Sequence, residues 1–166
     1  MDIEKKVHIE TSIDLNKLET FLYEIDKDFV PNLSKQVSIP DYAKKLINNA
    51  NFFVATSGSE ILGIIVFYSN DVHKKNAYIS ILGISWKMRG LGLGTKLIKL
   101  VLDLIRLKDF ETLNLETREN SSAQKLYEKL GFKVISTLPE RTKGVNRIQM
   151  RRWISNANPD LEPVKL

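Results

Sequence analysis

The sequence predicts an α/β (α+β) fold with a mixed, mostly antiparallel central sheet flanked by helices. Three observations lead to this prediction. Helix and strand periodicities alternate along the chain, two apolar runs are joined by the turn-forming segment SGSE, and strand-like and helix-like runs alternate again near the C-terminus. With 166 residues, 43% of them hydrophobic, the chain has the size of one domain with one core. We expect this domain to cover residues 1–155 and a C-terminal tail to follow at 156–166.

The N-terminal quarter is expected to be mainly helical. A short strand is predicted at KVHIE. Asp14 can cap a helix that runs through LNKLETFLYEI, because a carboxylate accepts hydrogen bonds from the first backbone N–H groups of a helix. A second helix, DYAKKLINN, is expected after Pro40, with Asp41 near its first turn.

The middle of the chain predicts strands and then a long helix. The runs NFFVAT and ILGIIVFYS read as a hairpin, because SGSE has the glycine and serine of a tight turn. The segment NDVHKK leads to a third strand, AYISILGIS. A helix, TKLIKLVLDLIRLKD, follows after a cluster of glycines.

The C-terminal part is expected to alternate between strands and helices. The run TLNLET predicts a strand, and SSAQKLYEKL predicts a helix that ends at Gly131. A strand FKVIST follows, and a last strand RIQMRRW comes after the polar loop PERTKGVN.

The composition limits the chemistry that the chain can perform. The absence of cysteine excludes disulfides and thiolate metal sites, and two histidines, His8 and His73, offer little for a metal, so no metal is expected. The net charge of +5 is spread among twenty acidic residues with no basic run between aromatics, so we expect no nucleic-acid partner but do expect an anionic small molecule. No stretch is long and apolar enough for a membrane span, which favours a soluble, cytoplasmic protein.

The segment RGLGLG carries three of the eight glycines, directly between a predicted strand and a predicted helix. Bare backbone at a helix start presents N–H groups and the positive end of the helix dipole, which together favour a phosphate. The nucleotide P-loop and the dinucleotide fingerprint both fail on spacing or context. The pattern Arg-x-x-Gly-x-Gly is met by Arg89, Gly92 and Gly94, although a tight turn alone would also explain the glycines.

A second motif lies at ENSSAQKLYEKLGF, residues 119–132. Together with the glycine segment it resembles the GNAT family of acetyl-CoA-dependent N-acetyltransferases, and the likeness covers residues 52–135 well. Eight residues match the later family signature: Asn120, Ala123, Leu126, Tyr127, Glu128, Lys129, Gly131 and Phe132. The resemblance implies an acyltransferase that uses acetyl-CoA (CoA) as co-substrate and lets an amine attack it directly in a ternary complex.

The resemblance also implies where CoA binds. The loop Gly90–Thr95 is expected to hold the pyrophosphate with backbone amides, and the strand end Leu82–Ile84 to pair with the pantetheine arm. Trp86 departs from the family, which often has proline there. The expected cofactor-binding residues are Leu82, Gly83, Ile84, Arg89, Gly90, Leu91, Gly92, Leu93, Gly94, Thr95 and Asn120.

Two residues are expected to be catalytic. Tyr127 matches the family position whose phenol donates a proton to the leaving thiolate; the alternative is a tyrosine that only packs on the sheet. Asn120 would bind CoA or cap the helix. Glu116, which ends the strand TLNLET, is the first choice for the general base, although it lies one residue closer to Tyr127 than the family form, and it could be a solvated charge. Other candidates for this role are Tyr78, Ser80, Asp71 and His73.

The acceptor is less clear from the sequence. In the family it is set by the N-terminal helices with their connecting loop, here FLYEIDKDFVPNLSKQVSIPDY, and by the loop before the last strand, PERTKGVN. FVPNLS followed by DYAKKL resembles members that modify bacterial surface sugars, which favours an amino sugar in a bacterial protein. Protein N-termini, polyamines and aminoglycosides stay open.

Two further expectations concern turnover and assembly. A non-catalytic acyl-CoA-binding regulatory module is the alternative function, but a module of that kind has no use for the proton donor Tyr127. A homodimer is expected through RIQMRRW and the N-terminal helices.

Overall fold

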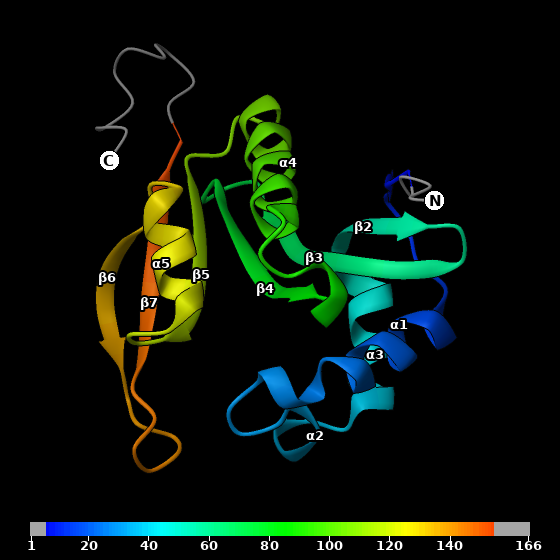
Figure 1. Ribbon diagram of the computed structural model, residues 1–166. Coiled ribbons are helices and arrows are strands. Elements are labelled where there is room, and N and C mark those ends of the chain that lie inside the picture. The colour runs from blue at the N-terminus through cyan, green and yellow to red at the C-terminus, as the bar shows by residue number, and fades with distance from the viewer. Residues whose placement is uncertain (1–5, 155–166) are drawn as a thin grey trace. The chain divides into compact units, whose positions relative to one another are not determined.

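Figure 1 shows a computed structural model of the chain, which describes residues 6–154. The predicted tail at 156–166 lies outside the described residues. The structure divides into two compact units. Unit 1 comprises the described residues up to Val66 together with Ile81–Leu97, and unit 2 comprises Phe67–Ser80 together with the described residues from Ile98 onward. The single domain expected for residues 1–155 stays a prediction.

Seven strands form the sheet, in the order β1-β2-β3-β4-β5-β7-β6. Strand β4 pairs in parallel with β5, whereas β1 with β2, β5 with β7, and β6 with β7 are antiparallel. This confirms the predicted mixed, mostly antiparallel sheet. The strands are β1 His8–Glu10, β2 Asn51–Ser57, β3 Glu60–Asp71, β4 Asn76–Ile84, β5 Thr112–Arg118, β6 Lys133–Leu138 and β7 Arg147–Trp153.

The predicted cap of the first helix of unit 1, Asp14, is confirmed. Asp14 Oδ1 accepts hydrogen bonds from the N–H groups of Asn16 and Lys17, at 3.0 and 3.2 Å, and so caps α1. Helix α3 begins two residues before the predicted start, because Pro40 fits inside a first helical turn, where its missing N–H is not needed. The helical segments are α1 Leu15–Glu24, the 3-10 helix η1 Asp26–Asp28, α2 Leu33–Gln36 and α3 Ile39–Asn49.

The predicted hairpin of β2 and β3 is present, with a turn at Gly58, whose φ is +60°. Strand β3 runs through Asn70 and Asp71, two residues that the sequence assigned to the following segment. The turn after β3 is closed by Asp71 Oδ1, which accepts from the N–H of Lys74 at 3.1 Å.

Unit 2 is built around β5 and β7, which pair along their whole lengths. The apolar residues of the two strands, Leu113, Leu115, Ile148 and Met150, are fully buried. Helix α5, Ser122–Lys129, packs on β5 (Figure 1). Because side chains alternate along a strand, the polar residues between these apolar ones point to the opposite face of the sheet.

The remaining long helix, α4, covers Leu93–Leu107. None of the helices within residues 6–154 is long and apolar enough to cross a membrane.

Candidate active site

The glycine segment of unit 1 lies between the 3-10 helix η2, Trp86–Met88, and α4. Gly90 and Gly92 have φ angles of +75° and +84°, a left-handed conformation that glycine adopts without strain. The loop is shorter than the sequence suggested, because α4 begins at Leu93 and therefore includes Gly94 and Thr95. The expectation of a loop through Thr95 was wrong: a glycine in the first helical turn does not prevent helix formation.

The start of α4 has the geometry of an anion site. Its first helical hydrogen bond joins the N–H of Lys96 to the C=O of Gly92 at 3.1 Å. The N–H groups of residues 93–95 therefore have no acceptor within the helix. A Cβ added at Gly90 or Gly92 would meet no atom within 4 Å, so the space beside this backbone is open. These features fit a bound phosphate.

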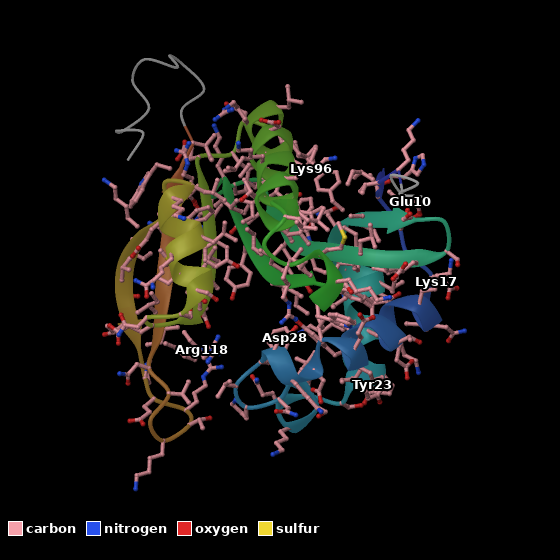
Figure 2. All side chains as sticks on the ribbon, in the orientation of Figure 1. Glu10, Lys17, Tyr23, Asp28, Lys96 and Arg118 are labelled. Carbon is pink, nitrogen blue, oxygen red and sulfur yellow. The ribbon has the colours of Figure 1, made fainter. Side chains whose placement is uncertain are left out.

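Arg89, expected to contact the cofactor, is held by other parts of unit 1. Its Nη2 forms an ion pair with Asp28 of η1 (labelled in Figure 2). Its Nε and Nη2 also lie 3.4 Å from the C=O of Ile84 at the end of β4. The side chain thus ties the glycine loop to the segment after α1.

The strand end Leu82–Ile84 contains a glycine with a packing role. A Cβ on Gly83 would lie 2.5 Å from Ile25 Cδ1 and 3.4 Å from Phe21 Cε1. Gly83 thus lets α1 pack closely against β4, and its expected pairing with the pantetheine arm stays a prediction. The adjoining Ser85 is buried and donates from Oγ to Glu24 Oε1 at 3.0 Å.

Helix α5 is not capped by Asn120, the residue that the sequence suggested. Its N-cap is Ser121, whose Oγ accepts from the N–H of Gln124 at 3.1 Å. Asn120 precedes the cap, has a φ of +59°, and donates its N–H to Gln124 Oε1 at 2.6 Å. The interpretation of Asn120 as the N-cap was therefore wrong, although Asn120 does shape the helix start. Its side chain is exposed.

Tyr127 is buried in unit 2, with its ring in an edge-on contact with Phe132 at 5.6 Å between centroids. Desolvation raises the pKa of the Tyr127 phenol to about 12, because burial disfavours the phenolate. Its hydroxyl therefore keeps its proton at neutral pH. A neutral phenol carries one O–H donor, so the group is chemically suited to donate to a ligand.

Glu116 lies on β5 directly opposite Gln149 of β7. Its Oε2 is 3.5 Å from Arg147 Nη2, and the Glu116 side chain is 27% exposed. Arg147 Nε is buried without a hydrogen-bond partner within the described residues. Glu116 is thus a half-buried carboxylate with a cationic neighbour, not a fully solvated charge.

A polar cavity of about 410 Å³ opens in unit 2, on the face of the sheet to which Glu116 points. Of the alternative bases, Tyr78 and Asp71 lie in its wall, whereas His73 is exposed in the turn after β3 and Ser80 is half-buried on β4. The lining residues are Tyr68, Asn70, Asp71, Asn76, Ala77, Tyr78, Asn114, Gln149 and Arg151.

Sequence reasoning named only Asp71 and Tyr78 of this wall and missed the other seven residues, Tyr68, Asn70, Asn76, Ala77, Asn114, Gln149 and Arg151. Three of the seven, Asn114, Gln149 and Arg151, lie next to apolar residues in the strands TLNLET and RIQMRRW. A half-buried strand shows the same pattern when its polar face is simply solvated. The pattern alone therefore could not separate a cavity wall from an exposed surface.

Comparison with known proteins decides the family. A model of the acetyltransferase (GNAT) family matches residues 19–132. The chain belongs to the GNAT family. GNAT enzymes use acetyl-CoA as co-substrate together with an amine acceptor, and the assignment supports an acyltransferase enzyme. No group of three or more histidine or acidic side chains in the described part of this GNAT protein could hold a metal ion.

Curated relatives point to one branch of the family. N-alpha-acetyltransferase 30 of Xenopus laevis is 35% identical over 129 residues, which cover 74% of this chain and 47% of that protein. The Homo sapiens protein of the same name is also 35% identical over 129 residues, covering 74% of this chain and 35% of its own length. The GNAT chain thus spans less than half the length of these relatives. Both come from eukaryotes, and the bacterial origin favoured by the sequence stays a prediction, as does a cytoplasmic location.

Solved structures share the fold. The ribosomal-protein-S18-alanine N-acetyltransferase from Escherichia coli has a TM-score of 0.74 and 20% identity, covering 94% of this chain and 99% of that one. Ard1 from Thermoplasma volcanium has a TM-score of 0.73 and 22% identity, covering 90% and 98%. At these identities the likeness concerns the fold alone.

Proposed function

We propose that this GNAT protein moves an acetyl group from acetyl-CoA to a primary amine, by direct attack in a ternary complex. The observation that carries the proposal is the start of α4, where two glycines with positive φ precede N–H groups without helical acceptors. When bound, acetyl-CoA supplies the acetyl group and a thiolate leaving group.

The glycine loop would hold the pyrophosphate. The N–H groups of residues 93–95 donate to phosphate oxygens, and the dipole of the 15-residue helix α4 adds a favourable field. Gly90 and Gly92 keep the approach open because they carry no side chain. Leu82, Ile84 and Asn120 keep their expected roles in binding the rest of the co-substrate.

Tyr127 would act on the leaving group. Burial raises the pKa of the Tyr127 phenol to about 12, so the phenol does not give up its proton readily. We therefore assign to the Tyr127 hydroxyl a hydrogen bond to the negative charge that develops on sulfur, which helps the transition state more than the ground state.

Glu116 would take the proton from the attacking amine. An alkylammonium has a pKa near 10.4, so the acceptor needs a base before it can attack at neutral pH. Glu116 offers a half-buried carboxylate, and its contact with Arg147 limits the orientations that the carboxylate adopts. Tyr78, on the neighbouring strand β4, is the second candidate for guiding this proton.

Two acceptors have support from different observations. The relatives called N-alpha-acetyltransferase 30 favour the α-amine of a polypeptide. The polar wall of the cavity in unit 2 favours a small hydroxylated amine, such as an amino sugar. Both fit the proposed transfer of acetyl to a primary amine.

The test is release of free thiol from acetyl-CoA in the presence of amines. The panel contains a peptide with a free N-terminus, an amino sugar and a polyamine. Amine-dependent thiol release supports the proposal. Acetyl-CoA that raises the melting temperature without any amine-dependent release would overturn it in favour of the regulatory module.

A further inference from the structure

We propose that the cavity in unit 2 holds the hydroxyl-bearing ring of an amino-sugar acceptor, with its amine directed toward Glu116. This inference rests on the proposed transferase function and names the substrate class for it. The volume of about 410 Å³ lies within the range of roughly 300–1,000 Å³ common for small-molecule sites.

The chemistry of the wall matches a polyol. The wall carries the amides of Asn70, Asn76 and Gln149, and an amide, like a sugar hydroxyl, can both donate and accept hydrogen bonds. Two of the amide oxygens already accept within the protein, Asn76 Oδ1 from Thr112 Oγ1 at 2.6 Å and Gln149 Oε1 from Ser136 Oγ at 3.2 Å, which leaves their N–H groups as the donors for a ligand. Two tyrosines, Tyr68 and Tyr78, add aromatic rings that suit the C–H surface of a sugar ring. An apolar N-terminal side chain of a peptide would desolvate these amides without bonding to them, which is costly.

The wall is organised by its own hydrogen bonds. Asn114 is buried and donates from Nδ2 to the C=O of Ala77 and to Thr112 Oγ1, both at 3.1 Å. Arg151 donates from Nε to Asn114 Oδ1 at 2.7 Å, and Thr112 Oγ1 donates to Asn76 Oδ1 at 2.6 Å. The guanidinium and two amides are thereby fixed before a ligand arrives, which lowers the entropic cost of binding.

Arg151 adds donors to this wall. Its guanidinium carbon lies 5.7 Å from the ring centroid of Trp153, a cation–π contact. Besides the Nε–H that is bonded to Asn114, the guanidinium carries four N–H groups on its two terminal nitrogens. These N–H groups can donate to a ring hydroxyl or to an anionic substituent of the sugar.

The register of β5 and β7 connects the cavity to Glu116. Asn114 pairs with Arg151, and Glu116 pairs with Gln149, so these four side chains share one face of the sheet. Glu116 is two residues beyond Asn114, about 7 Å along the strand. A monosaccharide ring against Asn114 and Arg151 can therefore present an amine to the Glu116 carboxylate.

The experiment compares three amines as acceptors. Glucosamine is the sugar amine, cyclohexylamine has a ring of the same size without hydroxyls, and a peptide with a free α-amine represents the alternative class. The proposal expects kcat/KM for glucosamine to exceed that for cyclohexylamine by at least about tenfold. Because the cavity recognises hydroxyls, the preference should lie mainly in KM.

Two substitutions probe the wall. Gln149→Leu removes an amide, and Asp71→Asn removes a charge while keeping the oxygen that accepts from Lys74. Both should lower kcat/KM for glucosamine by about tenfold or more and leave the thermal shift caused by CoA unchanged. Asn48→Leu, on the exposed side of α3, is the matched control and should behave like the wild type. Calorimetry with the CoA-bound protein should show that Gln149→Leu and Asp71→Asn bind glucosamine more weakly than the wild type and Asn48→Leu do.

The outcomes separate the two proposals. If CoA binds and the peptide alone is acetylated, the transferase function stands and the sugar site is overturned. Equal kcat/KM values for glucosamine and cyclohexylamine also overturn the sugar site, as does a Gln149→Leu variant with an unchanged KM for glucosamine. If no amine is acetylated, both proposals fail together.

Discussion

Replacement of Gly92 by valine tests the proposed phosphate site at its most sensitive position. Gly92 has a φ of +84°, which an L-residue adopts only at a cost of roughly 1–2 kcal/mol, and a β-branched residue least readily. A Cβ at this position would meet no atom within 4 Å. The substitution therefore introduces backbone strain without a steric clash, and we expect the protein to stay folded.

The effect on ligand binding should be larger than the effect on folding. A branched side chain at Gly92 either covers the N–H groups of residues 93–95 or moves the backbone that presents them. Hydrogen bonds to charged groups contribute about 1.5–3 kcal/mol each. Loss of two such bonds to phosphate would cost about 3 kcal/mol or more, which corresponds to at least about a 100-fold loss of affinity.

Thermal unfolding with acetyl-CoA measures this loss directly. A ligand at 100 times its Kd stabilises the native state by about 2.7 kcal/mol, and the same concentration gives only about 0.4 kcal/mol when affinity falls 100-fold. For a chain of this size 1 kcal/mol shifts Tm by roughly 2–4 °C. The wild type should therefore gain about 5–10 °C, and Gly92→Val should gain about 1 °C.

A second glycine supplies the matched control. Gly144 lies in the loop before β7, has a φ of +79°, and a Cβ there would also meet no atom within 4 Å. Gly144→Val should lower the basal Tm by a similar amount and keep the full shift with acetyl-CoA. If Gly92→Val keeps the wild-type shift, or both variants lose it equally, the reasoning about the amide site is refuted.

Four further predictions follow from unit 2 and from the assembly. Tyr127→Phe should lower kcat by about 10²-fold or more while calorimetry shows little change in CoA affinity, since only the hydroxyl is lost; an unchanged kcat, with chemistry limiting, would make Tyr127 a packing residue. Burial raises the pKa of Tyr127 from 10 to about 12, so the unfolded state loses this proton at a lower pH than the folded state does. The free energy of unfolding should therefore fall by about 3 kcal/mol as pH rises from 10 to 12. Urea unfolding should show this fall for the wild type but not for Tyr127→Phe. Equal alkaline slopes for the two proteins would show that Tyr127 is not the cause. Glu116→Gln should lower kcat at neutral pH by about 10²-fold or more, because an amide cannot take the proton from the amine, whereas an unchanged kcat would assign the base elsewhere. Sedimentation should give twice the chain mass of 19.0 kDa for a homodimer, and a monomer at tens of micromolar would contradict it.

Most elements were predictable because local signals agreed with the fold. The last strand, RIQMRRW, occupies the expected residues, since Ile148 and Met150 alternate with polar residues and so define one buried face. Asp14 caps α1 as expected because its side chain acts on its own chain neighbours. Signals of this kind need no knowledge of distant segments.

The misses have a different origin, because each depends on a partner far along the chain or on a choice between adjacent residues. The close packing of Gly83 against Ile25 of α1 is a contact that no local pattern reveals. Ser121 caps α5 in place of Asn120, although both residue types are good caps. The short helix α2 has four residues and is fixed by Asp26, which accepts from the N–H of Ser34 at 2.6 Å.

The acceptor, too, depends on residues that lie far apart in the sequence. The family match ends at residue 132, before β6 and β7 begin. Gln149 and Arg151, which form one side of the cavity, therefore lie outside the matched region. The family match therefore does not say what Gln149 and Arg151 bind. The acceptor must be decided by how substitutions in β7 change KM, because β7 supplies one side of the cavity.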